Sequence, residues 1–163
     1  KRMSPRDHKA DMRRVLERAA EAAAEGDVPV GCVIVRDGEI IGEGRNRREE
    51  NGDATAHAEL EAIRDACRRI GSWRLHRCTM YVTLEPCPMC AGAVRNARIS
   101  RVWYGARDSA FGACGGGVNR VMEEVLNSPA MVGGSLEEAC RKVLTAFLRD
   151  LGDGAVDPVR ASR

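Results

Sequence analysis

A strand that leads directly into a helix is expected at residues 79–97, TMYVTLEPCPMCAGAVRNA. The run Thr79–Leu84 is rich in apolar and β-branched residues, which is typical of a buried strand. Pro88 suits the first turn of a helix that continues to about Ala97, because proline needs no amide donor there. Cys87 and Cys90 are three residues apart at this helix start, so both thiols lie on one face. This spacing predicts that the two thiolates bind one metal ion.

A histidine and a glutamate stand at the start of another expected helix. Thr55 is a plausible N-cap for a helix of Ala56–Ile70 that Gly71 closes. His57 can therefore reach the same ion if the two strand–helix units are neighbours. Glu59 lies two residues further, about 200° around the helix, so it is not expected to bind the ion as well. A carboxylate in this place is suited to take a proton from the metal's water and pass it on.

Zinc is the metal that this donor set favours. Two thiolates and one neutral imidazole compensate the charge of Zn²⁺ and leave a fourth position for water, which distinguishes a catalytic zinc site from a structural one. Soft ligands and tetrahedral geometry favour zinc over iron or magnesium. We therefore expect His57, Cys87 and Cys90 to hold one Zn²⁺, with Glu59 as the catalytic acid–base group.

Two other interpretations of the cysteine pair remain open. A Cys-x-x-Cys motif is also found in redox-active sites and in structural zinc sites with four protein ligands. A structural site requires one more cysteine or histidine close in space, and the candidates for this ligand are His76, Cys67, Cys78 and Cys114. With such a ligand, the chain would be a non-catalytic zinc-binding module.

The remaining sequence alternates helical and extended segments, which predicts a three-layer α/β/α sandwich with a mixed sheet of about five strands. We expect one domain over residues 1–151 and a flexible tail over 152–163. In the first half of the chain, the other expected elements are a helix over Asp7–Glu25, strands over Pro29–Val35 and Glu39–Arg45 joined by a turn at Asp37-Gly38, and a polar loop over Arg47–Asp53. In the second half, we expect a strand over Ile99–Tyr104, a glycine-rich loop over Gly105–Gly117, a short helix over Val118–Leu126 and a strand over Ala130–Val132. A last helix is expected from a capping box at Ser135–Glu138 to about Leu151.

Composition agrees with a single globular domain in a reducing compartment. The 163 residues are 44% hydrophobic and 31% charged, with a formal net charge of +2. Seven scattered cysteines show no disulfide framework, which favours the cytoplasm. No apolar run approaches the ~18 residues of a membrane span, and the charged start lacks the core of a signal peptide. We expect a cytoplasmic protein without membrane contact.

The two motifs together resemble those of the zinc-dependent cytidine and deoxycytidylate deaminase superfamily, in which a histidine and two cysteines bind zinc and a nearby glutamate transfers protons. The similarity is strongest to the bacterial tRNA-specific adenosine deaminases and covers about three-quarters of the chain. The stretches that carry it are Thr55–Glu59, Thr83–Ala93, Val28–Gly31, Gly42–Arg47 and Gly105–Asp108.

The resemblance implies a cytidine deaminase-like fold, a homodimer, and hydrolysis of adenosine to inosine at the wobble position of a tRNA anticodon loop. It also implies roles for single residues. His57, Cys87 and Cys90 would bind one zinc per subunit, and Glu59 would transfer protons. The residues expected around the target nucleotide are Asn46, Val30, Ala58 and Leu84, with the backbone amides near Ala58 and Glu85 orienting the base and Asp108 contacting RNA.

Some stretches depart from the family pattern. Residues 111–117 are unusually rich in glycine, and the segment NSPAM at residues 127–131 replaces the family's polar and basic stretch before the last strand. The tail from residue 147 also lacks the expected run of basic residues, which predicts weaker RNA binding because cations supply most of the affinity for phosphates. These departures favour a rival function, the deamination of a free base or nucleoside of the guanine or cytosine type. Structural roles are also open for Asn46 as a turn residue and Asp108 as a cap.

Overall fold

The computed structural model describes residues 7–114 and 129–150. Among these residues, no helix is long and apolar enough to cross a membrane. The elements follow in the order α1 (His8–Ala24), β1 (Gly31–Arg36), β2 (Glu39–Arg45), α2 (Arg48–Asn51), α3 (Ala58–Ile70), β3 (Cys78–Leu84), α4 (Pro88–Asn96), β4 (Arg101–Ala106), β5 (Ala130–Val132) and α5 (Glu137–Asp150).

Five strands form one mixed sheet in the order β2-β1-β3-β4-β5. Strand β1 pairs antiparallel with both β2 and β3, whereas β4 is parallel to β3 and to β5. Asp37 and Gly38, with φ angles of 49° and 86°, form the turn between β1 and β2. The predicted hairpin and the predicted mixed sheet are both confirmed.

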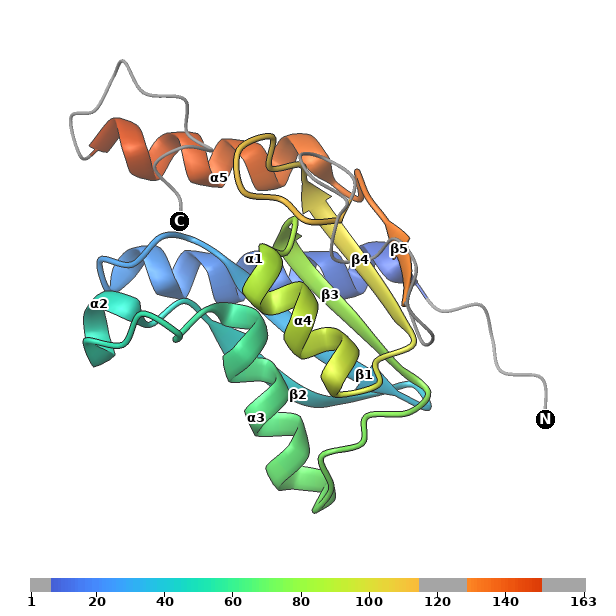
Figure 1. The fold of residues 1–163 in the computed structure, drawn as a ribbon. Coiled ribbons are helices and arrows are strands. Elements are labelled where there is room, and N and C mark those ends of the chain that lie inside the picture. The colour runs from blue at the N-terminus through green and yellow to red at the C-terminus, as the bar shows by residue number, and fades with distance from the viewer. Residues whose placement is uncertain (1–6, 115–128, 151–163) are drawn as a thin grey trace.

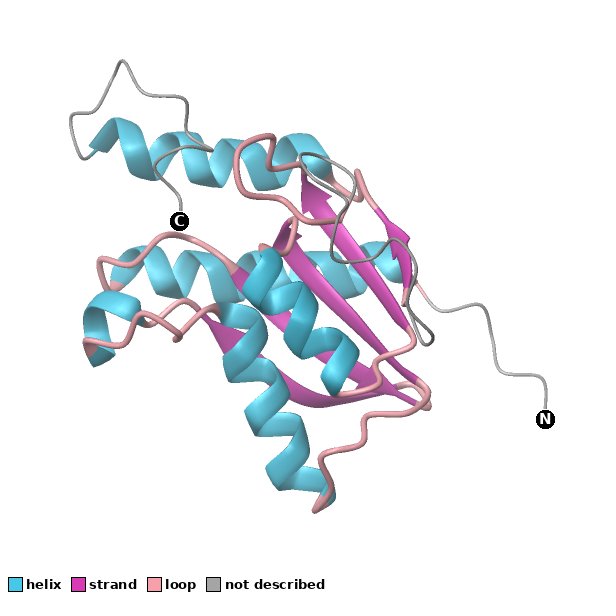
Figure 2. Cartoon of the chain, viewed as in Figure 1, coloured by secondary structure: helices cyan, strands magenta, loops and turns pink. Residues whose placement is uncertain are grey.

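Helices cover both faces of the sheet, as the alternating pattern predicts (Figures 1 and 2). The helices α3 and α4 lie side by side on one face, and α1 and α5 lie on the other. Glycines permit this close approach: a Cβ at Gly31 would collide with the backbone of α1, and one at Gly44 would collide with the Ala58 carbonyl of α3. The sheet therefore supports the start of α3 directly.

Two elements in the first half of the chain differ from the sequence prediction. Helix α3 begins at Ala58 with His57 as its N-cap, because Thr55 donates its amide and hydroxyl hydrogens to the Asp53 carboxylate instead of capping the helix. The short helix α2 lies inside the predicted polar loop. Its first turn is stabilised by Asp27, which accepts from the amides of Glu49 and Glu50 and is distant in sequence.

The second half contains smaller differences. Strand β4 begins at Arg101, because the Ile99 amide still bonds to the Val94 carbonyl at the end of α4. It also continues to Ala106, so Gly105 belongs to the strand and not to the glycine-rich loop. The expected helix at 118–126 and the expected flexible tail at 152–163 lie outside the described residues.

Candidate metal centre

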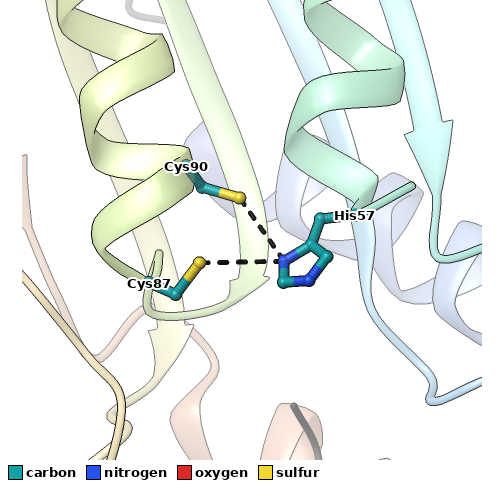
Figure 3. A group of neighbouring side chains, drawn as sticks. All are labelled: His57, Cys87 and Cys90. Carbon is teal, nitrogen blue, oxygen red and sulfur yellow. Dashed lines mark hydrogen bonds between the residues drawn. The ribbon is translucent and has the colours of Figure 1, made fainter. Parts of the chain in front are cut away.

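Three predicted ligands meet where two helices begin. His57 is the N-cap of α3, Cys87 is the N-cap of α4, and Cys90 lies in the first turn of α4. The imidazole of His57 points toward both thiols, with its Nδ1 3.7 Å from Cys87 Sγ and 3.5 Å from Cys90 Sγ (Figure 3). The three side chains are buried, and their ligand atoms lie within 4.8 Å of one another. The two strand–helix units are neighbours, as the prediction required.

The local backbone explains why these side chains face one another. The peptide groups of His57 are used in the turn, since its amide donates to the Thr55 carbonyl and its carbonyl accepts from the Glu61 amide. The His57 side chain makes no capping hydrogen bond. Instead, the Asn46 side chain accepts the Ala58 amide at 2.9 Å, so the imidazole need not cap the helix and can turn toward α4.

The spacing of the donor atoms fits a tetrahedral zinc ion. Zn–S bonds of about 2.3 Å and a Zn–N bond of about 2.0 Å separate sulfur from nitrogen by roughly 3.5 Å at a tetrahedral angle. The two observed separations of 3.5 and 3.7 Å agree with this value. Because Nδ1 faces the thiols, it is the atom that would bind the ion, which would leave the ring proton on Nε2.

No fourth protein ligand joins the group within the described parts of the chain. His57, Cys87 and Cys90 form the one cluster there with the geometry to hold a metal, and it excludes His76, Cys67, Cys78 and Cys114. Glu59 is also outside the cluster, as its position on the helix predicts. The described residues therefore provide three ligands, which leaves a coordination position for water.

Glu59 lies completely buried in the first turn of α3. Its surroundings include Cys32 on β1: burial, and secondly the negative charge of Glu59, raises the pKa of the Cys32 thiol well above its usual value. Cys32 therefore stays a neutral thiol beside the carboxylate. Glu59 is thus buried close in sequence to the zinc ligand His57 but is not part of the metal cluster.

The residues expected to shape a nucleotide pocket are all buried, and three of them lie together. The backbone amide of Asn46 donates to the Val30 carbonyl at 3.1 Å, and the side-chain oxygen of Asn46 accepts from the Ala58 amide. Leu84 ends β3, close in sequence to Cys87. Val30, Asn46 and Ala58 thus form one connected group next to His57.

Several groups that are expected to contact the substrate form hydrogen bonds within the chain. The amide of Ala58 donates to Asn46, and that of Glu85 donates to the Ala106 carbonyl at 2.9 Å, so these two amides are already used within the chain. Asp108 is fully buried, and its Oδ1 accepts from the amides of Ala110 and Phe111 at 3.1 and 2.9 Å. In this structure Asp108 caps the loop, and its contact to RNA stays a prediction.

Sequence reasoning missed a buried polar group under the loop that follows β4. Glu85 is fully buried and accepts from the Cys114 amide at 3.5 Å, while the Tyr104 hydroxyl donates to the Cys114 carbonyl at 3.4 Å. Burial, together with the charge of Glu85, raises the pKa of Tyr104. A Cβ at Gly112 would overlap the Glu85 carboxylate. The glycine at this position was therefore the one sequence signal that the loop packs closely against another group. The group holds the loop against the segment that carries Cys87.

Residues 5–106 match the family model described as the cytidine and deoxycytidylate deaminase zinc-binding region. The chain belongs to this family. Its zinc ligands are His57, Cys87 and Cys90, the cluster in which the donor distances fit the ion. The family's zinc chemistry and the geometry of this chain therefore agree.

Three relatives illustrate the range of this deaminase family. The chain is 46% identical over 141 residues to the tRNA-specific adenosine deaminase of Bacillus subtilis (strain 168), covering 86% of this chain and 88% of that one. A solved structure from work on A-to-I editing by tRNA:A34 deaminases is 39% identical, with a TM-score of 0.79 and coverage of 83% and 99%. The guanine deaminase of Bacillus subtilis is 32% identical, with a TM-score of 0.63 and coverage of 93% and 98%.

Proposed function

We propose that this deaminase converts adenosine to inosine at the wobble position of tRNA. The observation that carries the proposal is a three-ligand zinc site in a chain that is 46% identical, over most of its length, to a tRNA-specific adenosine deaminase. The reaction consumes water and releases ammonia. A tRNA substrate implies that the protein acts in the cytoplasm. We also expect residues 1–151 to form one deaminase domain.

His57, Cys87 and Cys90 would hold the metal that activates water for attack on the base. Zinc in this site would supply a Lewis acid that lowers the pKa of water. His57 would bind the ion through Nδ1, the ring nitrogen that faces the thiols, and Cys87 and Cys90 would supply the negative charge that balances the ion. The proposed target atom is C6 of a flipped-out adenine, one of the two base positions that zinc deaminases attack.

Glu59 is the proposed proton carrier. Its carboxylate would accept a proton from the attacking water and deliver it to the departing amino group, so that the nitrogen leaves as ammonia. Burial in the first turn of α3 limits exchange with bulk solvent.

Asn46 is the proposed contact to the target nucleotide. Its Oδ1 accepts the Ala58 amide, which fixes the orientation of the side-chain amide and leaves its two N–H groups as donors. Asn46 thus helps to position α3 and can recognise an acceptor on the substrate. Val30, Ala58 and Leu84 provide the apolar surface around the base.

A direct test compares the purified protein with its Glu59→Gln variant on a tRNA that has adenosine at the wobble position. We expect inosine at that position with the wild-type protein and almost none with the variant. Ammonia release from free guanine, together with no inosine in the tRNA, would overturn the proposal.

Guanine deamination is the second candidate. The observation that favours it is the 32% identity to a guanine deaminase that covers 93% of this chain. Free guanine, cytosine and adenosine therefore belong in the same assay, with ammonia as the common readout. The tRNA activity is favoured by the higher identity of the adenosine deaminase relatives.

We also propose a homodimer formed through the outer face of α4. Met89, 39% exposed, is one of the large apolar side chains left at the surface of the described chain. A Cβ at Gly92, one turn further along α4, would contact nothing within 4 Å. Gly92→Glu therefore fits the monomer but would obstruct a partner. Sedimentation should show a wild-type dimer and a folded, zinc-loaded monomer for this variant; a dimeric variant would contradict the interface.

A further inference from the structure

Two segments at one end of the molecule concentrate positive charge. Residues 68–77, RRIGSWRLHR, contain four arginines, and residues 95–101, RNARISR, contain three, with no acidic residue in either. The fold joins them, since the Leu75 amide donates to the Ala97 carbonyl at 2.7 Å and the Ser100 amide donates to the Cys78 carbonyl at 3.1 Å. Because the whole chain carries a net charge of only +2, this concentration is a local feature.

An exposed tryptophan lies within this charged end. Trp73 is 52% exposed, in the loop between α3 and β3. The guanidinium carbon of Arg74 lies 4.2 Å from the centre of its ring, and that of Arg98 lies 5.7 Å from it. Both guanidinium groups lie over the exposed ring. Proteins use exposed aromatic rings together with arginines to stack unpaired bases and to bind the adjoining phosphates.

The charges of this region are only partly neutralised. Arg68 and Arg69 both form ion pairs with Asp65. Arg77 forms an ion pair with Asp37, with 3.4 Å between a guanidinium nitrogen and a carboxylate oxygen. Arg74 and Arg101 are exposed and form no ion pair with a carboxylate of residues 7–114 and 129–150. We name Trp73, Arg74, Arg98 and Arg101 the Trp73 patch. Its excess of arginine favours a polyanionic partner.

The Trp73 patch is remote from the zinc ligands. Helix α3 begins beside His57 and ends just before Gly71, and its 13 residues extend over about 20 Å. In Figure 1 the loop after α3 lies at the bottom, at the opposite end of the helix from the metal site. A free base bound at the zinc cannot span this distance, whereas a folded RNA can.

We infer that the Trp73 patch is a second RNA-binding surface, which holds the tRNA by its phosphates and an accessible base while the wobble nucleotide is at the zinc. This inference rests on the proposed function, because it assumes that the substrate is an RNA. It assigns to the patch a role in affinity and not in the chemical step. The patch also compensates for the missing basic residues of the tail from residue 147.

The experiment measures binding of full-length tRNA and its deamination separately, on the intact protein. Trp73→Ala should raise the Kd about 5-fold or more, the loss expected for one stacked base, and Trp73→Phe should restore most of it. Arg74→Gln should reduce the slope of log K against log salt by about 0.7–0.9, the value for one phosphate contact. The kcat at saturating tRNA should stay unchanged in all three variants.

Arg13→Gln is the matched control, because Arg13 is an exposed arginine on α1, across the sheet from α3. It should alter neither the Kd nor the salt dependence. An unchanged Kd for both Trp73→Ala and Arg74→Gln would overturn the inference. A shift of Trp73→Ala from dimer to monomer in sedimentation would also overturn it, because the patch would then belong to a protein interface. Failure of the proposed function would be distinguishable from failure of this inference. The wild-type protein would then form no inosine in the tRNA, whatever the binding measurements show.

Discussion

The side-chain oxygen of Asn46 accepts a hydrogen bond from the amide of Ala58 at 2.9 Å, and both residues are buried. This bond ties the end of β2 to the first residue of α3, directly after the zinc ligand His57. It satisfies one of the amides that a helix start leaves without a partner in the helix. The orientation of His57 therefore depends on a residue that precedes it in the chain and does not touch the metal.

Asn46→Ala should weaken both the fold and the zinc site. Loss of the acceptor leaves the buried Ala58 amide unsatisfied, which should lower the free energy of unfolding by about 1–3 kcal/mol. Zinc should also be removed at a lower chelator concentration. Denaturant unfolding and chelator titration measure the two effects, and wild-type stability would contradict this account.

Asn46→Asp separates the structural role from substrate binding. The carboxylate keeps an acceptor for the Ala58 amide, so most of the stability lost in Asn46→Ala should be retained. It has no N–H donor, and activity should therefore fall as far as in Asn46→Ala if Asn46 donates to the nucleotide. Full activity of Asn46→Asp would exclude that contact.

Glu59→Gln should abolish most of the activity without changing the metal content. Glutamine has nearly the same shape but cannot carry a proton, so the rate should fall by ~10²–10⁴-fold. Metal analysis should find one zinc per chain, as in the wild-type protein, and circular dichroism should be unaltered. A variant that keeps its zinc and its rate would rule out Glu59 as the proton carrier.

Cys87→Ala and Cys114→Ala are a matched pair that tests the ligand set. Both cysteines are buried and lie near Pro86, but only Cys87 belongs to the metal cluster. Cys87→Ala should lose zinc, activity and stability together, because metal binding is coupled to folding. Cys114→Ala should retain the zinc, and loss of the ion from this variant would indicate a fourth protein ligand.

Asp108→Ala should release the loop that follows β4. It removes the acceptor for the Ala110 and Phe111 amides, so we expect a loss of about 1–2 kcal/mol in the free energy of unfolding and reduced activity. Asp108→Asn keeps an acceptor oxygen and should be close to wild type in both properties. If Asp108→Asn instead weakens tRNA binding as much as Asp108→Ala does, the charge of Asp108 contacts RNA and the cap is not its main role.

Local sequence rules predicted the α/β/α architecture well, since strand β3, Pro88 and the two cysteines combine signals that lie within a few residues. The same rules failed where the stabilising partner is distant. Thr55 looks like an N-cap, yet Asp53 binds it, and α2 depends on Asp27, which lies before β1. Such hydrogen bonds depend on which segments the fold brings together, and a local pattern does not contain that information.

For the metal site, the sequence alone determined the chemistry. It provides two thiols on one helix turn, a histidine at another helix start, and a glutamate that is not expected to bind the ion itself. Only the tertiary structure decided which atoms meet. It placed His57 Nδ1 within 3.7 Å of both sulfurs, excluded Cys114 from the cluster, and made Asp108 accept the Ala110 and Phe111 amides. The physical reason is that ligand type follows from side-chain chemistry, whereas coordination requires a few ångströms of precision. That precision comes from packing α3 and α4 side by side on one face of the sheet.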